Sequence, residues 1–278
     1  MSQGTVVLPG VYDAITAVAA HATGFNAAYI SGAAVTNSQL GVPDIGMATL
    51  TEFASQAARI CQAAPLPVLS DADTGFGETW NVVRCVIEME RAGLAGIHLE
   101  DQIMPKKCGH LDGKQLESAD EMVFKLRAAV SAKRDPDFLI VARTDARGVE
   151  GLPSAIDRAQ RYVDAGADAV FPEGLTSEEE FAAFRGAVKV PLLANMTEFG
   201  KTPIIGVQHF KELGYEMVIF PVSAMRVALK AVLGFYEALK VQGTQSGCLE
   251  TMTTREELYR LIEYAGYEST EADWKTQK

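Results

Sequence analysis

The sequence is poor in cysteine, and its cysteines are scattered. Four occur in 278 residues (Cys61, Cys85, Cys108 and Cys248), and no two of them form a Cys-x-x-Cys pair. The pattern therefore indicates neither a zinc site nor a disulfide framework. A reduced, cytoplasmic protein is the simplest interpretation.

Long hydrophobic runs, nucleotide motifs and an excess of positive charge are also missing. No segment is apolar over the roughly 18 residues of a membrane span, and Met1–Pro9 lacks the shape of a signal peptide. No Gly-x-Gly-x-x-Gly motif follows the first expected strand, and no Walker A motif occurs. The net charge of −11 argues against nucleic acid and anionic membranes as partners. An anionic substrate would need a local cluster of cations or a metal.

One pattern recurs four times: a helical stretch ends in glycine, and a short apolar segment follows. The glycines are Gly24, Gly93, Gly166 and Gly214, and the segments after them contain AAYIS, GIHLE, AVFPE and MVIFP. Glycine ends helices by adopting the left-handed conformation, and a near-continuous apolar run suits a buried parallel strand. Four more strands are expected at VVL near residue 6, PVLSDAD from Pro67, DFLIVARTD from Asp137 and PLLANM from Pro191.

Eight strands separated by amphipathic helices predict an α/β fold, a (β/α)₈ barrel of the TIM type. The alternative is an open, doubly wound sheet. No linker divides the chain, so residues 1–278 are expected to form a single barrel domain. Residues 243–278 are expected to be a C-terminal helical extension, with a helix near Arg255–Tyr264 and a polar tail. This extension would pack on a neighbouring subunit or support a lid.

Polar residues end seven of the eight apolar strands, where a barrel of this type carries its active site. They are Ser31, Asp71 with Asp73, His98 with Glu100 and Asp101, Arg143 with Asp145, Glu173, Asn195 with Thr197, and Ser223 with Arg226. Packing alone does not explain carboxylates and an arginine at these places. His98 fits two interpretations equally, a packed interior residue or a residue of the site.

Asp71-Ala-Asp73 is the candidate metal site. Two carboxylates with one residue between them can share a strand end, and hard oxygen ligands favour Mg²⁺ or Mn²⁺. The motif alone is weak, because a strand that turns into the TGFG loop would also explain it. Asp44 and Glu100 strengthen the interpretation as further carboxylates, bound directly or through water.

The segment Pro105-Lys-Lys-Cys-Gly-His110 sets a thiol among cations. Cationic neighbours favour the thiolate form and make Cys108 a candidate for proton exchange, and Gly109 permits a mobile loop. An exposed basic loop that holds a cysteine by chance is the alternative.

These residues coincide with the motifs of a known superfamily. In order along the chain, SGAAVTNSQLGVPDIG, DADTGFG, HLEDQ, PKKCGH, VARTDA, FPEG, LANMTEFG and PVSAMR resemble motifs of the isocitrate lyase and phosphoenolpyruvate mutase superfamily. The resemblance runs from about Pro9 to Tyr264. KKCGH is the most specific element, because it resembles the catalytic loop of the lyase branch, and the phosphonomutase branch lacks this cysteine. Ser31-Gly-Ala-Ala34 departs from the pattern, since some relatives carry more glycine there.

The resemblance implies a reaction. The short chain and the segments NMTEFG and TTREELY are most similar to the lyases that cleave 2-methylisocitrate to pyruvate and succinate in propionate catabolism. Phe171, Ile219 and Pro221 are candidates for the wall around the extra methyl group. The implied cofactor is Mg²⁺, with Mn²⁺ as a substitute, held by Asp71 and Asp73.

The resemblance also implies roles for residues. Cys108 would be the general acid, with Arg143, Lys106 and His110 as further catalytic residues. The implied substrate-binding residues are Ser31, Gly32, Ala33, Asp44, Glu100, Gly109, Glu173, Asn195, Met196, Thr197, Arg226 and Arg255. The implied assembly is a homotetramer with the last barrel helix swapped between subunits, which would bring Arg255 to a site. The expected partner is a small tricarboxylate substrate.

Three alternatives stay open. A related lyase or hydrolase could act on dimethylmalate, isocitrate or oxaloacetate and share the cysteine. A phosphonomutase-like enzyme would have no need of the thiol in KKCGH. A metabolite-binding barrel without catalysis would need no reactive thiol either.

Overall fold

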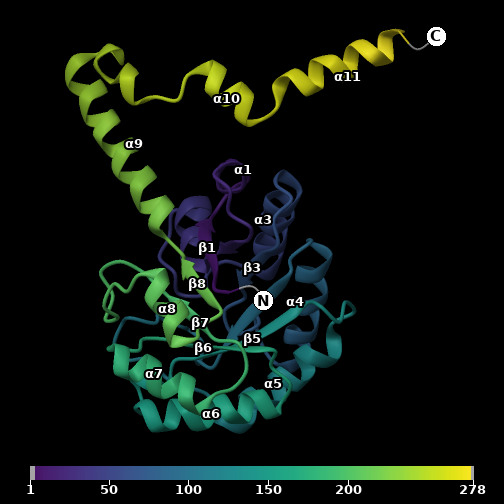
Figure 1. Ribbon diagram of the computed structural model, residues 1–278, viewed down its shortest axis with the longest axis vertical. Helices are drawn as coiled ribbons and strands as arrows, with labels where there is room; N and C mark the ends of the chain where they lie inside the picture. The colour runs from purple at the N-terminus through teal and green to yellow at the C-terminus, as the bar shows by residue number, and fades with distance from the viewer. Residues whose placement is uncertain (1–3, 277–278) are drawn as a thin grey trace.

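Eight parallel strands form the centre of the computed structural model, which describes residues 4–276 (Figure 1). The ends of the predicted 1–278 domain lie outside these residues. The strands are β1 (Val6–Val11), β2 (Ala28–Ile30), β3 (Val68–Asp71), β4 (Gly96–Glu100), β5 (Leu139–Thr144), β6 (Ala169–Pro172), β7 (Leu193–Asn195) and β8 (Met217–Phe220). All eight predicted strands are therefore present.

The sheet closes into a barrel. Its hydrogen-bonded order is β6-β5-β4-β3-β2-β1-β8-β7, and a parallel bridge between Val170 and Leu192 joins β6 to the start of β7. The register places Asp71 beside His98 and Glu100 beside Arg143. The polar residues at the strand ends are thus level around one mouth of the barrel, and the TIM-type prediction is confirmed.

Helices cover the outside of the barrel (Figure 1). They include α1 (Ala14–Ala22), α3 (Leu50–Ala63), α4 (Thr79–Arg91), α5 (Ala119–Ala132), α6 (Leu152–Asp164), α7 (Glu178–Ala187) and α8 (Val207–Leu213). Short turns of helix, α2 (Gly32–Val35), a π-helical turn (Thr36–Leu40) and η2 (Ala146–Gly148), follow β2 and β5. The four glycines of the repeated helix–strand pattern all have positive φ, from 82° at Gly214 to 103° at Gly166, as a left-handed helix end requires.

Apolar side chains fill both faces of the strands. Outside, Val68, Ile97 and Ile140 pack against buried residues of the surrounding helices. Inside, the barrel holds a separate cluster that includes Tyr29, Phe171 and Ile219. Burial on both faces explains why the strands read as continuous apolar runs instead of alternating ones.

The C-terminal arm leaves the barrel (Figure 1). It consists of α9 (Ser223–Gln242), η3 (Ser246–Thr251), α10 (Arg255–Leu261) and α11 (Tyr264–Thr276), and no residue of these four elements is buried. The described part of the expected polar tail forms α11, a helix that the sequence did not predict separately. Among the described residues, no helix is long and apolar enough to cross a membrane.

Candidate active site

A cavity of about 90 Å³ lies at the C-terminal ends of the strands, the expected place for a site in such a barrel. Phe171, Ile219 and Pro221, the expected apolar wall, line it. Most of the polar residues selected from the sequence line it as well: Ser31, Ala33, Asp44, Asp71, Lys106, Cys108, Gly109, His110, Arg143, Glu173, Asn195, Thr197 and Arg226. The structure thus brings together side chains from six strands and one long loop.

The remaining selected residues lie elsewhere. Gly32, Asp73 and Glu100 sit behind the cavity wall, each in contact with a residue that lines it. Met196 is buried, and its sulfur accepts a hydrogen bond from the Ile205 N–H at 3.4 Å, so it supports the loop after β7 instead of facing the cavity.

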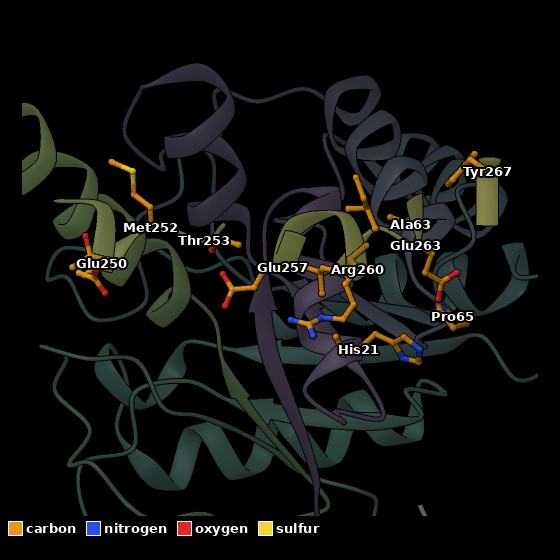
Figure 2. Close-up of a pocket in the computed structure, with 15 residues that line it drawn as sticks. His21, Ala63, Pro65, Glu250, Met252, Thr253, Glu257, Arg260, Glu263 and Tyr267 are labelled. Atoms are coloured by element: carbon orange, nitrogen blue, oxygen red, sulfur yellow. The ribbon is translucent and has the colours of Figure 1, made fainter. Parts of the chain in front are cut away.

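Arg255 is exposed at the start of α10, on the C-terminal arm. A larger hollow of about 1190 Å³ shows where this arm lies (Figure 2). It is lined by His21 of α1, Arg260 of α10 and Pro65, which comes just before β3. The arm therefore lies beside the C-terminal ends of α1 and α3, and Arg255 does not line the cavity of its own chain.

Asp71 is held at the end of β3 by backbone amides. Its Oδ2 accepts a hydrogen bond from the Gly32 N–H at 3.1 Å, and its Oδ1 accepts one from the Asp73 N–H at 2.9 Å. Burial raises the pKa of Asp71, but His98, Lys106 and Arg143 outweigh it and lower the pKa to about 2. Asp71 is thus ionised, and it already uses the Gly32 N–H that was expected to bind a substrate carboxylate.

Asp73 and Glu100 are buried carboxylates that form ion pairs, with Lys106 and Arg143, but accept few hydrogen bonds. Asp73 has a left-handed backbone with φ 46°, a strain that non-glycine residues tolerate mainly at functional sites. Burial raises the pKa of Asp73 to about 7, although Lys106 opposes the shift, and burial also raises the pKa of Glu100. Within residues 4–276, nothing donates a hydrogen bond with good geometry to Asp73 Oδ1 or to either Glu100 oxygen.

These oxygens fit a hard divalent cation. Buried polar atoms normally have partners, and carboxylate oxygens are the ligands that Mg²⁺ and Mn²⁺ prefer. Among the described residues, no three or more Asp, Glu, His or Cys side chains are grouped closely enough to hold a metal by themselves. Water or substrate oxygens would therefore have to complete the coordination of an ion beside Asp71 and Asp73.

Lys106 corrects one expectation, that it lies beside the thiol. Its buried ammonium lies 2.5 Å from Asp44 Oδ1 and 2.8 Å from Asp73 Oδ1, so it faces the carboxylates and not the thiol. Asp44, expected near the metal, is engaged by the same ammonium. The reason is electrostatic: a buried ammonium needs carboxylate partners, and two are within reach.

Cys108 lies on a long excursion between β4 and α5, here called the Cys108 loop (residues 103–114). Backbone hydrogen bonds from Ile103 N to Gln115 O and from Glu117 N to Asp101 O close its base. The thiol lines the cavity and is exposed. The basic residues next to Cys108 in the sequence make contacts with other groups. Lys106 pairs with Asp44 and Asp73, Lys107 Nζ donates to Asp112 O at 3.4 Å, and His110 lies against Glu173. The structure therefore does not show the cluster of cations that was expected around the sulfur.

His110 links the Cys108 loop to the loop after β7. Its Nδ1 accepts a hydrogen bond from the Lys201 N–H at 3.1 Å, which places the ring proton on Nε2, 3.2 Å from Glu173 Oε1. Glu173 Oε2 also accepts from Asn195 Nδ2 at 3.0 Å. Burial raises the pKa of Glu173, but Arg143 and His110 outweigh it and hold the pKa well below its usual range.

Arg143 extends its fork across the barrel mouth. Its Nε and Nη2 donate to the two oxygens of Asp145 at 2.9 and 3.2 Å, and Nη1 lies 3.1 Å from Glu100. The guanidinium also lies 5.2 Å from the centre of the Phe171 ring. These three partners fix the orientation of the Arg143 guanidinium beside the cavity.

Arg226 is positioned differently. It pairs with Glu198 through Nη1, which donates to both the backbone oxygen and Oε2 at 2.8 Å. Binding of a substrate carboxylate by Arg226 would have to compete with Glu198.

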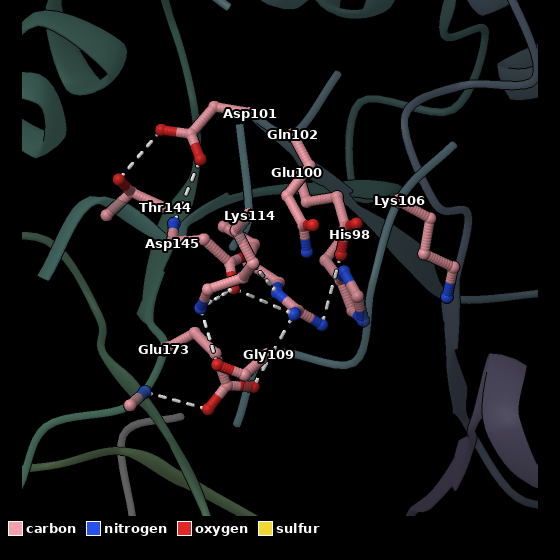
Figure 3. Close-up of polar contacts among 12 residues, drawn as sticks. His98, Glu100, Asp101, Gln102, Lys106, Gly109, Lys114, Thr144, Asp145 and Glu173 are labelled. Atoms are coloured by element: carbon pink, nitrogen blue, oxygen red, sulfur yellow. Dashed lines mark hydrogen bonds and ion pairs between the residues drawn. The ribbon is translucent and has the colours of Figure 1, made fainter. Parts of the chain in front are cut away.

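Sequence reasoning missed two partners of this machinery. Asp145 was noticed only as a strand-end residue, although its spacing of two from Arg143 is a signal that both can face the same side. Lys114 left no signal, because a lysine in a polar loop is normally exposed. In the structure its side chain is buried, and it donates to Asp145 Oδ1 at 2.7 Å (Figure 3).

Comparisons with known proteins agree with this geometry. A family model described as phosphoenolpyruvate phosphomutase matches residues 1–240. The 2-methylisocitrate lyase of Aeropyrum pernix is 56% identical over 268 residues, 96% of this chain and 86% of that protein.

Two solved structures are similar over nearly their whole length. Oxaloacetate acetylhydrolase in complex with 3,3-difluorooxalacetate matches with a TM-score of 0.93 and 36% identity, covering 98% of this chain and 93% of that one. The 2,3-dimethylmalate lyase matches with a TM-score of 0.91 and 37% identity, covering 99% and 91%. The chain therefore belongs to the phosphoenolpyruvate mutase and isocitrate lyase superfamily, as its motif series predicts.

Proposed function

We propose that this protein is a carbon–carbon lyase that cleaves 2-methylisocitrate to pyruvate and succinate with the help of Mg²⁺, for which Mn²⁺ can substitute. The observation that carries the proposal is the cavity itself: buried carboxylates, Arg143 and an exposed thiol line it together. The identity to the Aeropyrum pernix 2-methylisocitrate lyase supports the choice of substrate.

The reaction needs one deprotonation and one protonation. A base takes the proton of the 2-hydroxyl, whose electron pair forms the carbonyl of pyruvate as the carbon–carbon bond breaks. The electrons of that bond stay on the succinate half, and Cys108 donates the proton that completes succinate. A general acid on the Cys108 loop fits this order, because the carbanion exists only after cleavage.

A divalent cation, when bound, supplies positive charge that favours loss of the hydroxyl proton and stabilises negative charge on oxygen. Asp71 and Asp73 would hold it, with Glu100 and Asp44 contributing through water. Arg143 adds a positive charge beside the cavity, and Asp145 and Glu100 orient its guanidinium.

The rest of the cavity would bind the substrate's carboxylates and methyl group. Ser31 and Ala33 lie where the carboxylate of the pyruvate half would bind, at the start of α2. The carboxylates of the succinate half would be held by Asn195, Thr197, Arg226 and Arg255, with Arg255 supplied by another subunit. Phe171, Ile219 and Pro221 would surround the methyl group.

The assembly proposed is a cytoplasmic homotetramer in which α9 is exchanged between subunits. α9 has no buried residue, and its large apolar side chains Val227, Leu233 and Tyr236 are at least half exposed. A 20-residue helix with an apolar face is stabilised mainly by packing, so a second copy is the occupant that we propose.

One steady-state comparison tests the substrate. With Mg²⁺ present, kcat/KM for 2-methylisocitrate should exceed that for isocitrate by roughly ten- to two-hundredfold, the range that an apolar pocket gives for one methyl group. Dimethylmalate and oxaloacetate are the other two compounds to compare, because the two similar solved structures are enzymes named after them. A higher kcat/KM for oxaloacetate or dimethylmalate would replace the proposed substrate.

A further inference from the structure

We propose that Lys114 is a positioning residue that seats the Cys108 loop over the active site and couples the position of this loop to Arg143. Lys114 is the last residue of the Cys108 loop; it does not line the cavity, and its side chain is only 4% exposed. Its ammonium makes two contacts, a hydrogen bond to the Gly109 carbonyl at 2.5 Å and one to Asp145 Oδ1 at 2.7 Å.

The first contact fixes the residue next to the thiol. Gly109 follows Cys108 directly, so holding the Gly109 carbonyl restricts where the sulfur can lie. Gly109 itself packs closely against two residues of the site: an added Cβ would be 2.4 Å from Glu173 Cγ and 2.7 Å from Arg143 Nη2. Only a residue without a side chain can sit there, and the Lys114 ammonium donates to its carbonyl oxygen (Figure 3).

The second contact joins the loop to the barrel. Asp145 lies just beyond β5 and accepts hydrogen bonds from both Lys114 and Arg143, while its own N–H donates to Asp101 Oδ1 at 2.9 Å. Displacing the loop would therefore remove a cation from Asp145 and change the field around Arg143. A charge-assisted contact between buried groups is strong enough to bias a loop between seated and unseated positions.

A rival interpretation is that Lys114 only balances the buried charge of Asp145. Arg143 already donates two hydrogen bonds to that carboxylate. Burial lowers the pKa of Arg143, but Asp145 and Glu100 outweigh it and raise the pKa well above its ordinary value. The carboxylate would thus keep a cation without Lys114, whereas the Gly109 carbonyl has no second hydrogen-bond donor among the described residues.

Hydrogen–deuterium exchange of the Lys114→Met variant tests the proposal, because methionine keeps the length of the side chain and removes its charge. Peptides covering the Cys108 loop should exchange about tenfold faster or more than in the wild type, while peptides of β3, β4 and β5 should not change. Lys125→Met is the matched control, since Lys125 is also buried and lies 2.5 Å from one carboxylate, Glu117. Gly109→Ala gives the reference pattern of an unseated loop.

A kinetic double-mutant cycle adds a readout that a purely structural role would not affect. This part rests on the proposed lyase reaction, whereas the exchange measurement needs no substrate, so the two can fail separately. Lys114→Met should lower kcat by roughly tenfold or more with little change in KM, and it should lower the rate of a Cys108→Ser background much less. Lys125→Met should leave kcat unchanged.

Two results would overturn the proposal. One is unchanged exchange in the Cys108 loop of Lys114→Met. The other is faster exchange in β3, β4 and β5 to the same degree as in the loop, which would show general destabilisation. If Lys114→Met does not fold, Lys114→Leu, which also removes the ammonium donor, takes its place under the same criteria.

Discussion

Lys106 Nζ lies 2.8 Å from Asp73 Oδ1 at the rear of the cavity. A single ammonium thereby faces the carboxylates that are proposed to hold the metal, and it comes from the loop that carries Cys108. The metal site and the catalytic loop are thus electrostatically connected.

Replacing Lys106 by methionine should tighten metal binding while it slows turnover. Removing one positive charge a few ångströms from a divalent cation favours that cation, by roughly tenfold or more in Kd at the effective dielectric constant of a protein site. Mn²⁺ titration followed by electron paramagnetic resonance measures the change. Lys107→Met is the control, because Lys107 is exposed. An unchanged Kd for the Lys106 variant would show that the ammonium does not act on the bound ion.

Chelation should abolish activity, and Mg²⁺ or Mn²⁺ should restore it. Asp71→Asn should weaken Mn²⁺ binding strongly, since an amide oxygen is a poorer ligand for a hard cation than a carboxylate. Asp168→Asn is a suitable control, because Asp168 pairs with Lys133 outside the cavity. Full activity after verified removal of metal would contradict the proposed site.

Cys108→Ser should lower kcat by about 10²–10⁴-fold, the usual effect of losing a positioned general acid. KM should change little, because the proton is transferred only after the bond breaks. Steady-state kinetics on folded protein, checked by circular dichroism, gives both constants. Cys248→Ser on the C-terminal arm should behave like the wild type, and a Cys108→Ser enzyme with near-normal kcat would rule out the proposed acid.

The cysteine thiols should react with iodoacetamide at different rates. Burial raises the pKa of Cys61 to about 11 and raises that of Cys85 as well, so at pH 8 only about one Cys61 thiol in a thousand is ionised. Exposed Cys108 should therefore react first, with activity lost in parallel. Cys61 labelling should rise about tenfold per pH unit up to its pKa while the fold stays intact. Peptide mass spectrometry follows each site, and equal rates at Cys85 and Cys108 would contradict this order.

The barrel and the members of its site could be predicted because their signals are local. Each strand is a continuous apolar run that ends in a polar residue, and parallel strands put all those ends at one mouth. Asp71, Arg143 and Glu173 therefore meet as expected. Lys106 and His110 were assigned to the site from the family motifs, because composition alone would predict that both lie in an exposed loop.

The pairing of charges could not be predicted, because it depends on the path of loops. Lys106 and Asp44 are 62 residues apart, and nothing local indicates that they meet. Lys114 points inward only because the Cys108 loop folds back over it. α11 was missed for another reason: none of its residues is buried, so it lacks the apolar periodicity that reveals most helices.

Arg255 provides a test of the exchanged assembly. Within its own chain it lies on the C-terminal arm and does not line the cavity, so it can serve a site only if that site belongs to another copy. Light scattering should give a mass four times the 29.9 kDa of one chain. Arg255→Met and Cys108→Ser should each be nearly inactive alone.

Mixed assemblies of the two inactive variants should regain activity. When subunits exchange, a site built from the Cys108 of one variant and the Arg255 of the other has both residues intact. Random pairing with reciprocal exchange gives roughly a quarter of the wild-type sites. The variants are mixed after partial dissociation, and activity is measured against each variant treated alone. A mixture of Cys108→Ser with Cys108→Ser/Arg255→Met, which contains no intact thiol, should stay inactive. If the first mixture also stays inactive although mass spectrometry shows hybrid assemblies, Arg255 does not act across subunits.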